Sequence, residues 1–197
     1  MENDRLEKQI EFITEIDKLK HIKRQTILMD GSRKENDAEH SWHLAVMAML
    51  LSEHAADKNL DLFKVMKMVL IHDLVEIDAG DTYVYDEKAN EDKAEREQKA
   101  ADRIFSILPE DQAREIRALW EEFEERTTAE ARFAAALDRF QPLLHNYKTK
   151  GRSWKEHGVT KDQVMKRKES IKSGSKILGE CAERLINESV EKGYLKE

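Results

Sequence analysis

The sequence predicts an all-α fold, and two observations lead to that prediction. Only 7 glycines and 2 prolines occur among 197 residues, so few positions favour a break over a helix. Apolar residues recur at intervals of three and four, the spacing of one helix face, rather than at two. With 40% hydrophobic residues and no linker-like stretch rich in proline, glycine or serine, we expect one domain, residues 1–197, around a well-buried core.

The first third of the chain is expected to form two helices separated by a turn. An apolar stripe predicts a first helix over about residues 5 to 22. Residues 29–32, with the sequence Met-Asp-Gly-Ser, predict a turn because aspartate and glycine favour turn backbone. A second helix should begin near Asn36 or Asp37, either of which could cap it, and run to about residue 56.

Helices also account for the rest of the chain. A third is expected over about residues 61 to 77, with the turn chemistry of residues 78 to 82 ending it. The charged stretch from residue 86 to 98 is typical of a solvated helix face. Further helices are expected over about residues 92–107, 110–125, 129–149 and 161–192.

Polar side chains lie at the ends of two apolar stripes. His40 leads a series of apolar residues at steps of four, three and four, which places its side chain on the buried face of the second helix. On the third helix, His72, Asp73 and Glu76 end a similar stripe. Because burying a polar group costs free energy unless it is partnered, we expect these groups to have a chemical role.

Two histidines and two carboxylates in helical segments form a candidate metal site. His40, the doublet His72-Asp73 and Asp138 offer mixed nitrogen and oxygen donors, a set that suits a catalytic divalent metal. The structural alternative is a core histidine satisfied by a neighbouring carboxylate, which would explain one such residue rather than the whole set.

Composition excludes some partners. Asp and Glu (41) outnumber Lys and Arg (34), and without a basic stripe a nucleic-acid polymer is not an expected partner. A mononucleotide is not excluded, because one metal ion and one arginine can balance a single phosphate. The longest apolar run, Leu44 to Leu51, is shorter than the roughly twenty residues that cross a bilayer, so no membrane partner is expected. Cys181 is the only cysteine and the first residues are charged, so we expect a cytoplasmic protein.

Four motifs, taken in order, resemble the HD-domain phosphohydrolase superfamily. They are Ala38-Glu39-His40-Ser41, Ile71-His72-Asp73-Leu74-Val75-Glu76, Gly80-Asp81 and Ala136-Leu137-Asp138. Within the superfamily, the chain looks most like the branch of five-prime deoxynucleotidases and similar HD-domain-containing proteins. The resemblance covers about residues 10 to 148, which implies an HD-like core followed by a C-terminal helical extension over residues 149–197.

The resemblance implies a role for each site residue. A single divalent ion, with manganese, cobalt or magnesium as the expected metal, would be held by His40, His72, Asp73 and Asp138. Glu76 would orient or deprotonate the attacking water, and Asp81 would assist proton transfer. In some relatives these two carboxylates hold a second ion, with the backbone carbonyl of Thr82 as a further ligand.

The resemblance also implies the substrate and two residues that bind it. The branch hydrolyses deoxyribonucleoside 5′-monophosphates, so the expected partner is a small phosphorylated molecule, in the first place a nucleotide. Arg24 matches the phosphate-binding arginine of the family, although by position alone it would be a solvated surface group. Gln25 stands where the pattern has a tryptophan. An apolar ring could help reject a ribose hydroxyl and an amide could bind it, so strict selection of deoxy substrates is not expected.

Pro142 follows Asp138 by four residues within a predicted helix. Because proline has no N–H, the carbonyl of Asp138 loses its helical partner there. One hypothesis is that the resulting bend aims the Asp138 carboxylate into the site, and the other is that Pro142 begins a new helix.

Two other functions fit the same sequence. A nucleoside triphosphate or alarmone hydrolase of the superfamily would favour extra basic residues near the metal, and the sequence around His40 and His72 is not especially basic. A regulatory protein that keeps the metal as a structural clamp would not need Glu76 and Asp81 beside four ligands. The resemblance further implies a homodimer joined through helix faces.

Overall fold

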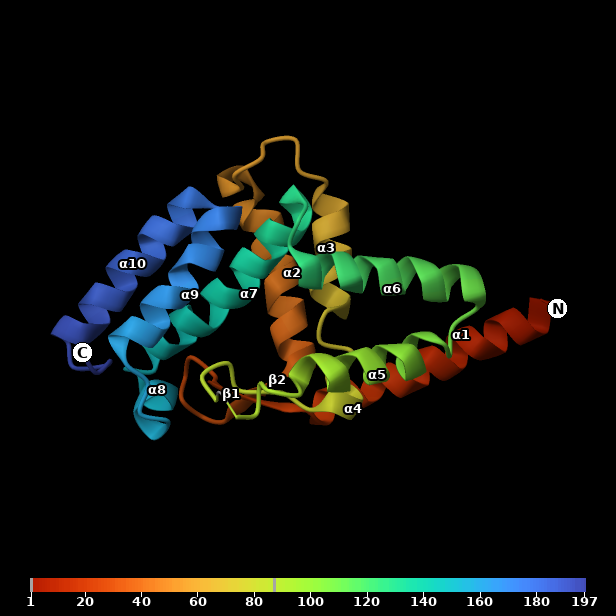
Figure 1. The fold of residues 1–197 in the computed structure, drawn as a ribbon, viewed down its shortest axis with the longest axis horizontal. Coiled ribbons are helices and arrows are strands. Elements are labelled where there is room, and N and C mark those ends of the chain that lie inside the picture. The colour runs from red at the N-terminus through yellow and green to blue at the C-terminus, as the bar shows by residue number, and fades with distance from the viewer. Residues whose placement is uncertain (1, 87) are drawn as a thin grey trace.

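The computed structural model describes residues 2–86 and 88–197 and is predominantly helical, which confirms the all-α prediction (Figure 1). Its α-helices are α1 (Glu2–Ile16), α2 (Asp37–Leu51), α3 (Leu62–Ile71), α4 (Glu76–Ala79), α5 (Lys93–Phe105), α6 (Glu110–Glu125), α7 (Ala129–Lys148), α8 (Arg152–Glu156), α9 (Lys161–Gly174) and α10 (Lys176–Glu191). Short 3-10 helices η1 (Asp17–His21) and η2 (Ser52–His54) follow α1 and α2. Within the described residues, the helices are too short or too polar to span a membrane.

Helix α7 lies at the centre of the fold. It packs against α9, α3, α10, α6 and α2, and its side chains Phe133 and Leu137 are fully buried. A second apolar cluster, around Ile104, Phe105 and Trp120, joins α5 to α1 and α6. In Figure 1, α1, α5 and α6 extend together toward the N-terminus, away from α9 and α10. The candidate site residues lie where α2, α3 and α7 meet.

A two-stranded hairpin precedes α2, which the helical periodicity did not predict. Strands β1 (Lys23–Ile27) and β2 (Lys34–Asn36) pair antiparallel, with an irregular register between Lys23 and Ile27. The predicted turn at residues 29–32 is confirmed as the hairpin connection, where Gly31 takes a positive φ of 76°. The hairpin places Arg24 of β1 beside Glu35 of β2.

The predicted third helix ends early. The backbone departs from α3 at His72, and successive hydrogen bonds then run back three residues, as in the bond from the Glu76 amide to the Asp73 carbonyl. Helix α4 begins at Glu76, so the single helix expected over residues 61–77 is wrong. The tighter turn lies at the His-Asp doublet, where both side chains face the centre of the molecule.

The single helix expected over residues 161–192 is also wrong. The chain breaks between α9 and α10 at Ser175, which has extended backbone and whose hydroxyl accepts a hydrogen bond from the Leu178 amide. Gly174 packs so closely on the backbone of α7 that a side chain there would collide with the carbonyl of Arg132. Periodicity did not reveal this break, because both helices bury apolar residues in similar phase.

Pro142 lies inside α7, which continues to Lys148. The alternative that a new helix begins at Pro142 is therefore wrong. The Asn146 side chain donates a hydrogen bond to the Pro142 carbonyl (3.1 Å), four residues back.

Candidate metal centre

Three separate segments bring the four predicted metal ligands together. His40 lies on the first turn of α2, a helix whose start is fixed by a capping box between Asn36 and Glu39. His72 and Asp73 follow the end of α3, and Asp138 projects from the middle of α7. The exposed fraction of these four residues ranges from 0% for His40 to 7% for Asp73, so all four lie inside the protein. The prediction that His40 faces the core is confirmed.

The donor atoms converge on a single point. Nε2 of His40 lies 3.1 Å from Oδ1 of Asp138 and 4.0 Å from Oδ2 of Asp73. Nε2 of His72 lies 3.1 Å from Oδ1 of Asp73 and 3.7 Å from Oδ1 of Asp138. His40, His72 and Asp73 place their ligand atoms within 4.8 Å of one another, and Oδ1 of Asp138 lies beside both imidazoles. One ion could therefore contact all four side chains after small movements.

The hydrogen bond of His72 and the burial of His40 also suit a cation. Nδ1 of His72 donates to the Val69 carbonyl (3.0 Å), which leaves the lone pair of Nε2 directed at the cluster. In the part of the chain that the structure describes, that buried Nε2 has no hydrogen-bond partner. Burial, followed by the positive charge of Arg24, lowers the pKa of His40 to about 4, so this imidazole is neutral. The residues present therefore fit a divalent metal ion.

A second group of carboxylates adjoins the first. Asp37, Asp73 and Glu76 place their oxygens within 4.8 Å of one another, all of them buried. Arg24 is the neighbouring cation, with Nη1 donating to Asp37 (3.1 Å) and Asp73 (2.7 Å). Burial and the charge of Asp73 raise the pKa of Asp37 to about 7, and the same causes raise the pKa of Glu76 well above its usual value. A divalent cation would relieve this repulsion.

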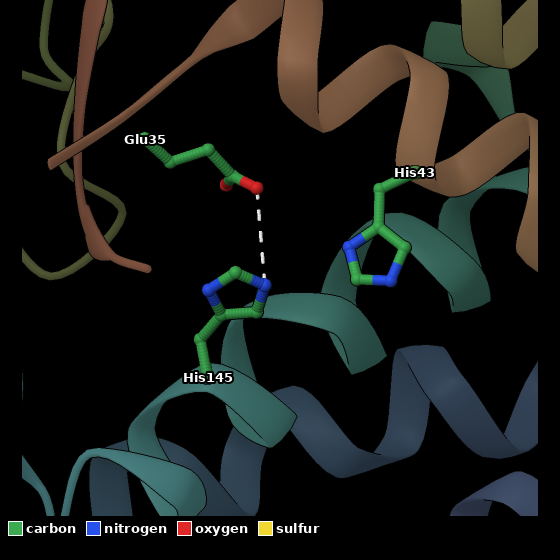
Figure 2. A group of neighbouring side chains, drawn as sticks. All are labelled: Glu35, His43 and His145. Atoms are coloured by element: carbon green, nitrogen blue, oxygen red, sulfur yellow. Dashed lines mark ion pairs between the residues drawn. The ribbon is translucent and has the colours of Figure 1, made fainter. Parts of the chain in front are cut away.

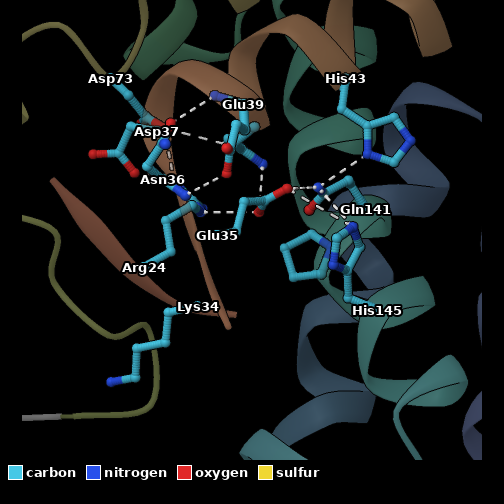
Figure 3. A network of polar contacts seen from close by, with 12 residues as sticks. Arg24, Lys34, Glu35, Asn36, Asp37, Glu39, His43, Asp73, Gln141 and His145 are labelled. Carbon is cyan, nitrogen blue, oxygen red and sulfur yellow. Dashed lines mark hydrogen bonds and ion pairs between the residues drawn. The ribbon is translucent and has the colours of Figure 1, made fainter. Parts of the chain in front are cut away.

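Glu35 connects the metal cluster to a layer of polar residues behind it. Its Oε2 lies 3.7 Å from Nδ1 of His40 and 3.8 Å from Nε of Arg24. Its Oε1 accepts a hydrogen bond from the Gln141 amide (2.6 Å), as Figure 3 shows. The same amide nitrogen lies 3.0 Å from Nε2 of His145. Glu35 is thus placed to orient both a predicted ligand and the predicted phosphate-binding arginine.

His43 belongs to this rear layer. Glu35, His43 and His145 point toward one another in Figure 2, and their ligand atoms lie within 4.8 Å of one another. The amide nitrogen of Gln141 lies within hydrogen-bond distance of all three, but its two hydrogens can serve only two of them at once. Among the described residues, the buried Oε2 of Glu35 has no hydrogen-bond partner.

A cavity opens beside the metal cluster and contains the other predicted site residues. Arg24, Gln25, Glu76 and Asp81 all line it, together with His72, Asp73 and Asp138. The Gln25 side chain accepts a hydrogen bond from Lys34 (2.6 Å). Burial raises the pKa of the Asp81 carboxyl, against the charge of Arg24. Glu76 groups with Asp37 and Asp73, whereas the expected pairing was with Asp81.

Several residues at this site were not identified from the sequence. Asp37 looked like a helix cap, but Asn36 is the cap and the Asp37 side chain is buried in the carboxylate group. The sequence signal for it was an acidic residue three positions before a predicted ligand. Basic residues from distant segments also line the cavity, namely Lys93, Arg126, Arg139 and Arg167. No local pattern marks them, because they meet only in the fold.

The fold and the donor set define a member of a known class. The family described as HD domain matches residues 16–178, which is most of the chain. The protein belongs to the HD-domain family, so the resemblance seen in its motifs is confirmed at this level.

Curated relatives are 5′-deoxynucleotidases. The chain is 32% identical to human 5′-deoxynucleotidase HDDC2 over 136 residues, which are 68% of this chain and 65% of the human protein. It is 32% identical to the Dictyostelium discoideum protein of that name over 143 residues, covering 70% of this chain and 75% of that one. The chain thus spans slightly less than two thirds of the human protein.

Solved structures agree with the fold. A protein described as a predicted metal-dependent phosphohydrolase from Magnetospirillum magnetotacticum MS-1 is 57% identical, with a TM-score of 0.96 over 100% of this chain and 98% of that one. The PH0347 protein of Pyrococcus horikoshii OT3 is 22% identical, with a TM-score of 0.64 over 93% of this chain and 99% of that one, and supports the fold alone.

Proposed function

We propose that this protein is a metal-dependent phosphomonoesterase that releases phosphate from ribo- or deoxyribonucleoside 5′-monophosphates. The observation that carries the proposal is the convergence of His40, His72, Asp73 and Asp138 on one point at the wall of a cavity. The relatives named 5′-deoxynucleotidases support the nucleotide as the substrate class.

The four convergent side chains would hold the ion, and manganese, cobalt or magnesium are the metals we propose. When bound, a divalent ion supplies Lewis-acid polarisation of a phosphoryl oxygen and makes water more acidic. Two neutral imidazoles and two carboxylates leave a net charge near zero once the ion is present, which favours an incoming anion.

Glu76 is the proposed proton acceptor. Its carboxylate is buried beside Asp73 and Asp37, and burial together with the charge of these carboxylates raises its pKa, which makes it a stronger base toward water than a solvated glutamate. The water oxygen forms the new P–O bond while the bond to the ester oxygen breaks. Asp81, also on the cavity wall, would return a proton to the departing alcohol. A second ion is the alternative role for Glu76, with Asp37 and Asp73 as its partners in this chain.

Arg24 would bind the phosphate. In the described residues both of its hydrogen bonds to side chains use Nη1, so the far side of the guanidinium can face the cavity that it lines. Asp37 and Asp73 fix its position, and two anchored bonds reduce the entropy lost when phosphate binds. Gln25 would donate a hydrogen bond to the sugar or accept one from it. We therefore expect the rate of hydrolysis to differ little between ribose and deoxyribose substrates.

The test is phosphate release across ribo- and deoxyribonucleoside mono- and triphosphates by metal-stripped protein reloaded with manganese, cobalt or magnesium. Metal-dependent release from monophosphates is the expected result. Release only from triphosphates would favour the hydrolase alternative. Tight metal binding without turnover of any nucleotide would favour a regulatory protein.

We also propose that the protein is a cytoplasmic homodimer. Large apolar side chains are exposed on two neighbouring helices, with Trp42 and Leu50 of α2 and Phe63 of α3 each more than 60% exposed. Burying them against a second copy would remove this apolar surface from water. Light scattering of the purified protein should give twice the chain mass of 23.0 kDa, and a monomer would refute the dimer. Cell fractionation tests the location.

A further inference from the structure

Three arginines from separate elements gather on one wall of the cavity. Arg126 ends α6, Arg139 follows Asp138 on α7, and Arg167 lies on α9. All three are partly buried. Burial, and then the charge of Arg139, lowers the pKa of both Arg126 and Arg167, so the three guanidinium groups are close enough to repel one another.

This positive charge is only partly compensated. Arg139 contacts Asp138, and Arg167 donates to the backbone carbonyl of Val84 (2.8 Å). Across residues 2–86 and 88–197, neither Arg126 nor Arg167 has a carboxylate within 4.0 Å. In the same residues, the buried Nε atoms of Arg126 and Arg139 have no hydrogen-bond partner. Buried donors without an acceptor are costly, so an acceptor from outside the chain would be favoured.

The backbone of Arg126 is unusual in a way that favours a role for its side chain. It lies in the left-handed region, with φ 56° and ψ 30°, at the end of α6 where glycine is the usual residue. An arginine in that conformation costs free energy that glycine would avoid. The chain therefore keeps a strained, partly buried arginine on the wall of the candidate site.

The arginines and the proposed phosphate site are separate parts of one cavity. Arg24, bound to Asp37 and Asp73, lies on the carboxylate side with Glu76 and Asp81. The three arginines lie on the side of Asp138, and Tyr85 also lines the cavity near Arg167. One phosphoryl group at the metal would use Arg24. On the other wall, among the described residues, only Arg139 has a carboxylate within 4.0 Å, that of Asp138.

We propose that Arg126, Arg139 and Arg167 bind a second anionic group of the substrate. Among phosphomonoesters, nucleoside 5′-monophosphates included, the preferred substrates are then those that carry another phosphate or a carboxylate besides the phosphoryl group that is hydrolysed. This inference rests on the proposed function, because it presumes that hydrolysis occurs at the metal. The sequence around His40 and His72 is not especially basic, but these arginines lie far from both histidines in the chain and come near the site only in the fold.

The experiment compares substrates that differ only in the second anion. The phosphate pair is 2′-deoxyadenosine 5′-monophosphate and 2′-deoxyadenosine 3′,5′-bisphosphate, and the carboxylate pair is glycerol 3-phosphate and 3-phosphoglycerate. For at least one pair, kcat/KM should be about tenfold or more higher for the doubly anionic member, the size of a charge-assisted hydrogen bond. The pair that shows the preference identifies the anion.

Variants test whether the arginines cause the preference. Arg126→Gly removes the side chain and suits the left-handed backbone, and Arg167→Gln removes charge while keeping length. Each should lower the ratio of doubly to singly anionic kcat/KM by about tenfold. Arg114→Gln is the matched control, because the Arg114 side chain is 73% exposed on the surface of α6, and it should leave the ratio unchanged. Thermal unfolding would check that each variant is folded.

Binding to the metal-stripped chain of 197 residues separates this inference from the proposed function. Calorimetry should give tighter binding of the doubly anionic compound, lost in Arg126→Gly and Arg167→Gln. That result, together with no turnover of these compounds by the metal-loaded protein, would support the arginine site and refute the phosphomonoesterase. Turnover without any preference between the paired compounds, or a preference that the variants retain, would overturn the arginine site and leave the phosphomonoesterase standing.

Discussion

Replacing Glu35 with glutamine tests how the rear polar layer supports the candidate metal centre. Glu35 is 1% exposed, and its Oε2 lies between His40 and Arg24. Glutamine keeps the side-chain volume and an oxygen that can still accept from Gln141. The substitution removes the negative charge and turns an NH₂ group toward Nδ1 of His40 and Nε of Arg24, which are also donors.

The magnitude follows from the distances. Removing an outer partner of a metal ligand usually weakens metal binding by about 10- to 100-fold. Oε2 lies 3.7 Å from Nδ1 of His40 and 3.8 Å from Nε of Arg24, both longer than a hydrogen bond. We therefore expect Glu35→Gln to weaken binding by about tenfold, or about 1.4 kcal/mol.

Isothermal titration of metal-stripped protein with Mn²⁺ measures this change directly. The matched control is Glu39→Gln, since the Glu39 side chain is 36% exposed and glutamine can maintain the capping box. The control should bind Mn²⁺ like the parent protein. A dissociation constant for Glu35→Gln within twofold of the parent value would refute a role for Glu35 in positioning His40.

Three further changes probe the helix, the cap and a buried histidine. Pro142→Ala restores an N–H that can donate to the Asp138 carbonyl. If the proline directs the Asp138 carboxylate into the site, the variant should bind Mn²⁺ more weakly and turn over more slowly. Unchanged Mn²⁺ affinity and turnover would refute that hypothesis. Asn36→Ala deletes the acceptor for the Glu39 amide (2.9 Å) and should lower the free energy of unfolding by about 1 kcal/mol in urea titrations, whereas no loss would contradict the capping role. Burial lowers the pKa of His145 in the folded protein, so this histidine binds more protons in the unfolded state than in the folded state. The free energy of unfolding should therefore decrease as the pH falls below about 6.5, the ordinary pKa of histidine. The decline in stability from pH 7 to 5.5 should be smaller in His145→Gln, and equal declines would exclude this linkage.

The sequence predicted the long amphipathic helices best. Helix α6 spans Glu110–Glu125 as expected, and α7 ends one residue before its expected end at 149. Their apolar residues repeat over many turns, so the periodic signal is strong. The hairpin was missed because β1 and β2 are five and three residues long, and short strands carry little periodic signal.

Tertiary packing explains the two wrong helix boundaries. The break at Ser175 depends on the close approach of Gly174 to α7, which no local pattern reveals. The end of α3 at His72 falls where polar side chains turn into the interior. In both places the local sequence allows a continuous helix, and contacts with distant residues decide otherwise.

At the candidate site too, local sequence patterns predicted some residues, and contacts between distant segments brought in the others. Histidines and carboxylates at helical positions, together with the resemblance, led to the four convergent side chains. Asp37 was hidden by its likeness to a helix cap, and Glu35 lies on a strand that was not predicted. The cavity arginines come from positions 126, 139 and 167, so their common location follows from the packing of α6, α7 and α9.

The most direct test of the central claim is turnover of a nucleoside 5′-monophosphate while metal-stripped protein is titrated with Mn²⁺. Turnover should appear with added metal, and His72→Ala should lower the turnover rate by more than about 100-fold. That exceeds the loss typical for a residue that only hydrogen-bonds to a metal ligand. His21→Ala, an exposed histidine of η1, is the matched control and should behave like the parent protein. Turnover by the stripped protein, or a His72→Ala variant as active as the parent, would contradict a metal centre at His40, His72, Asp73 and Asp138.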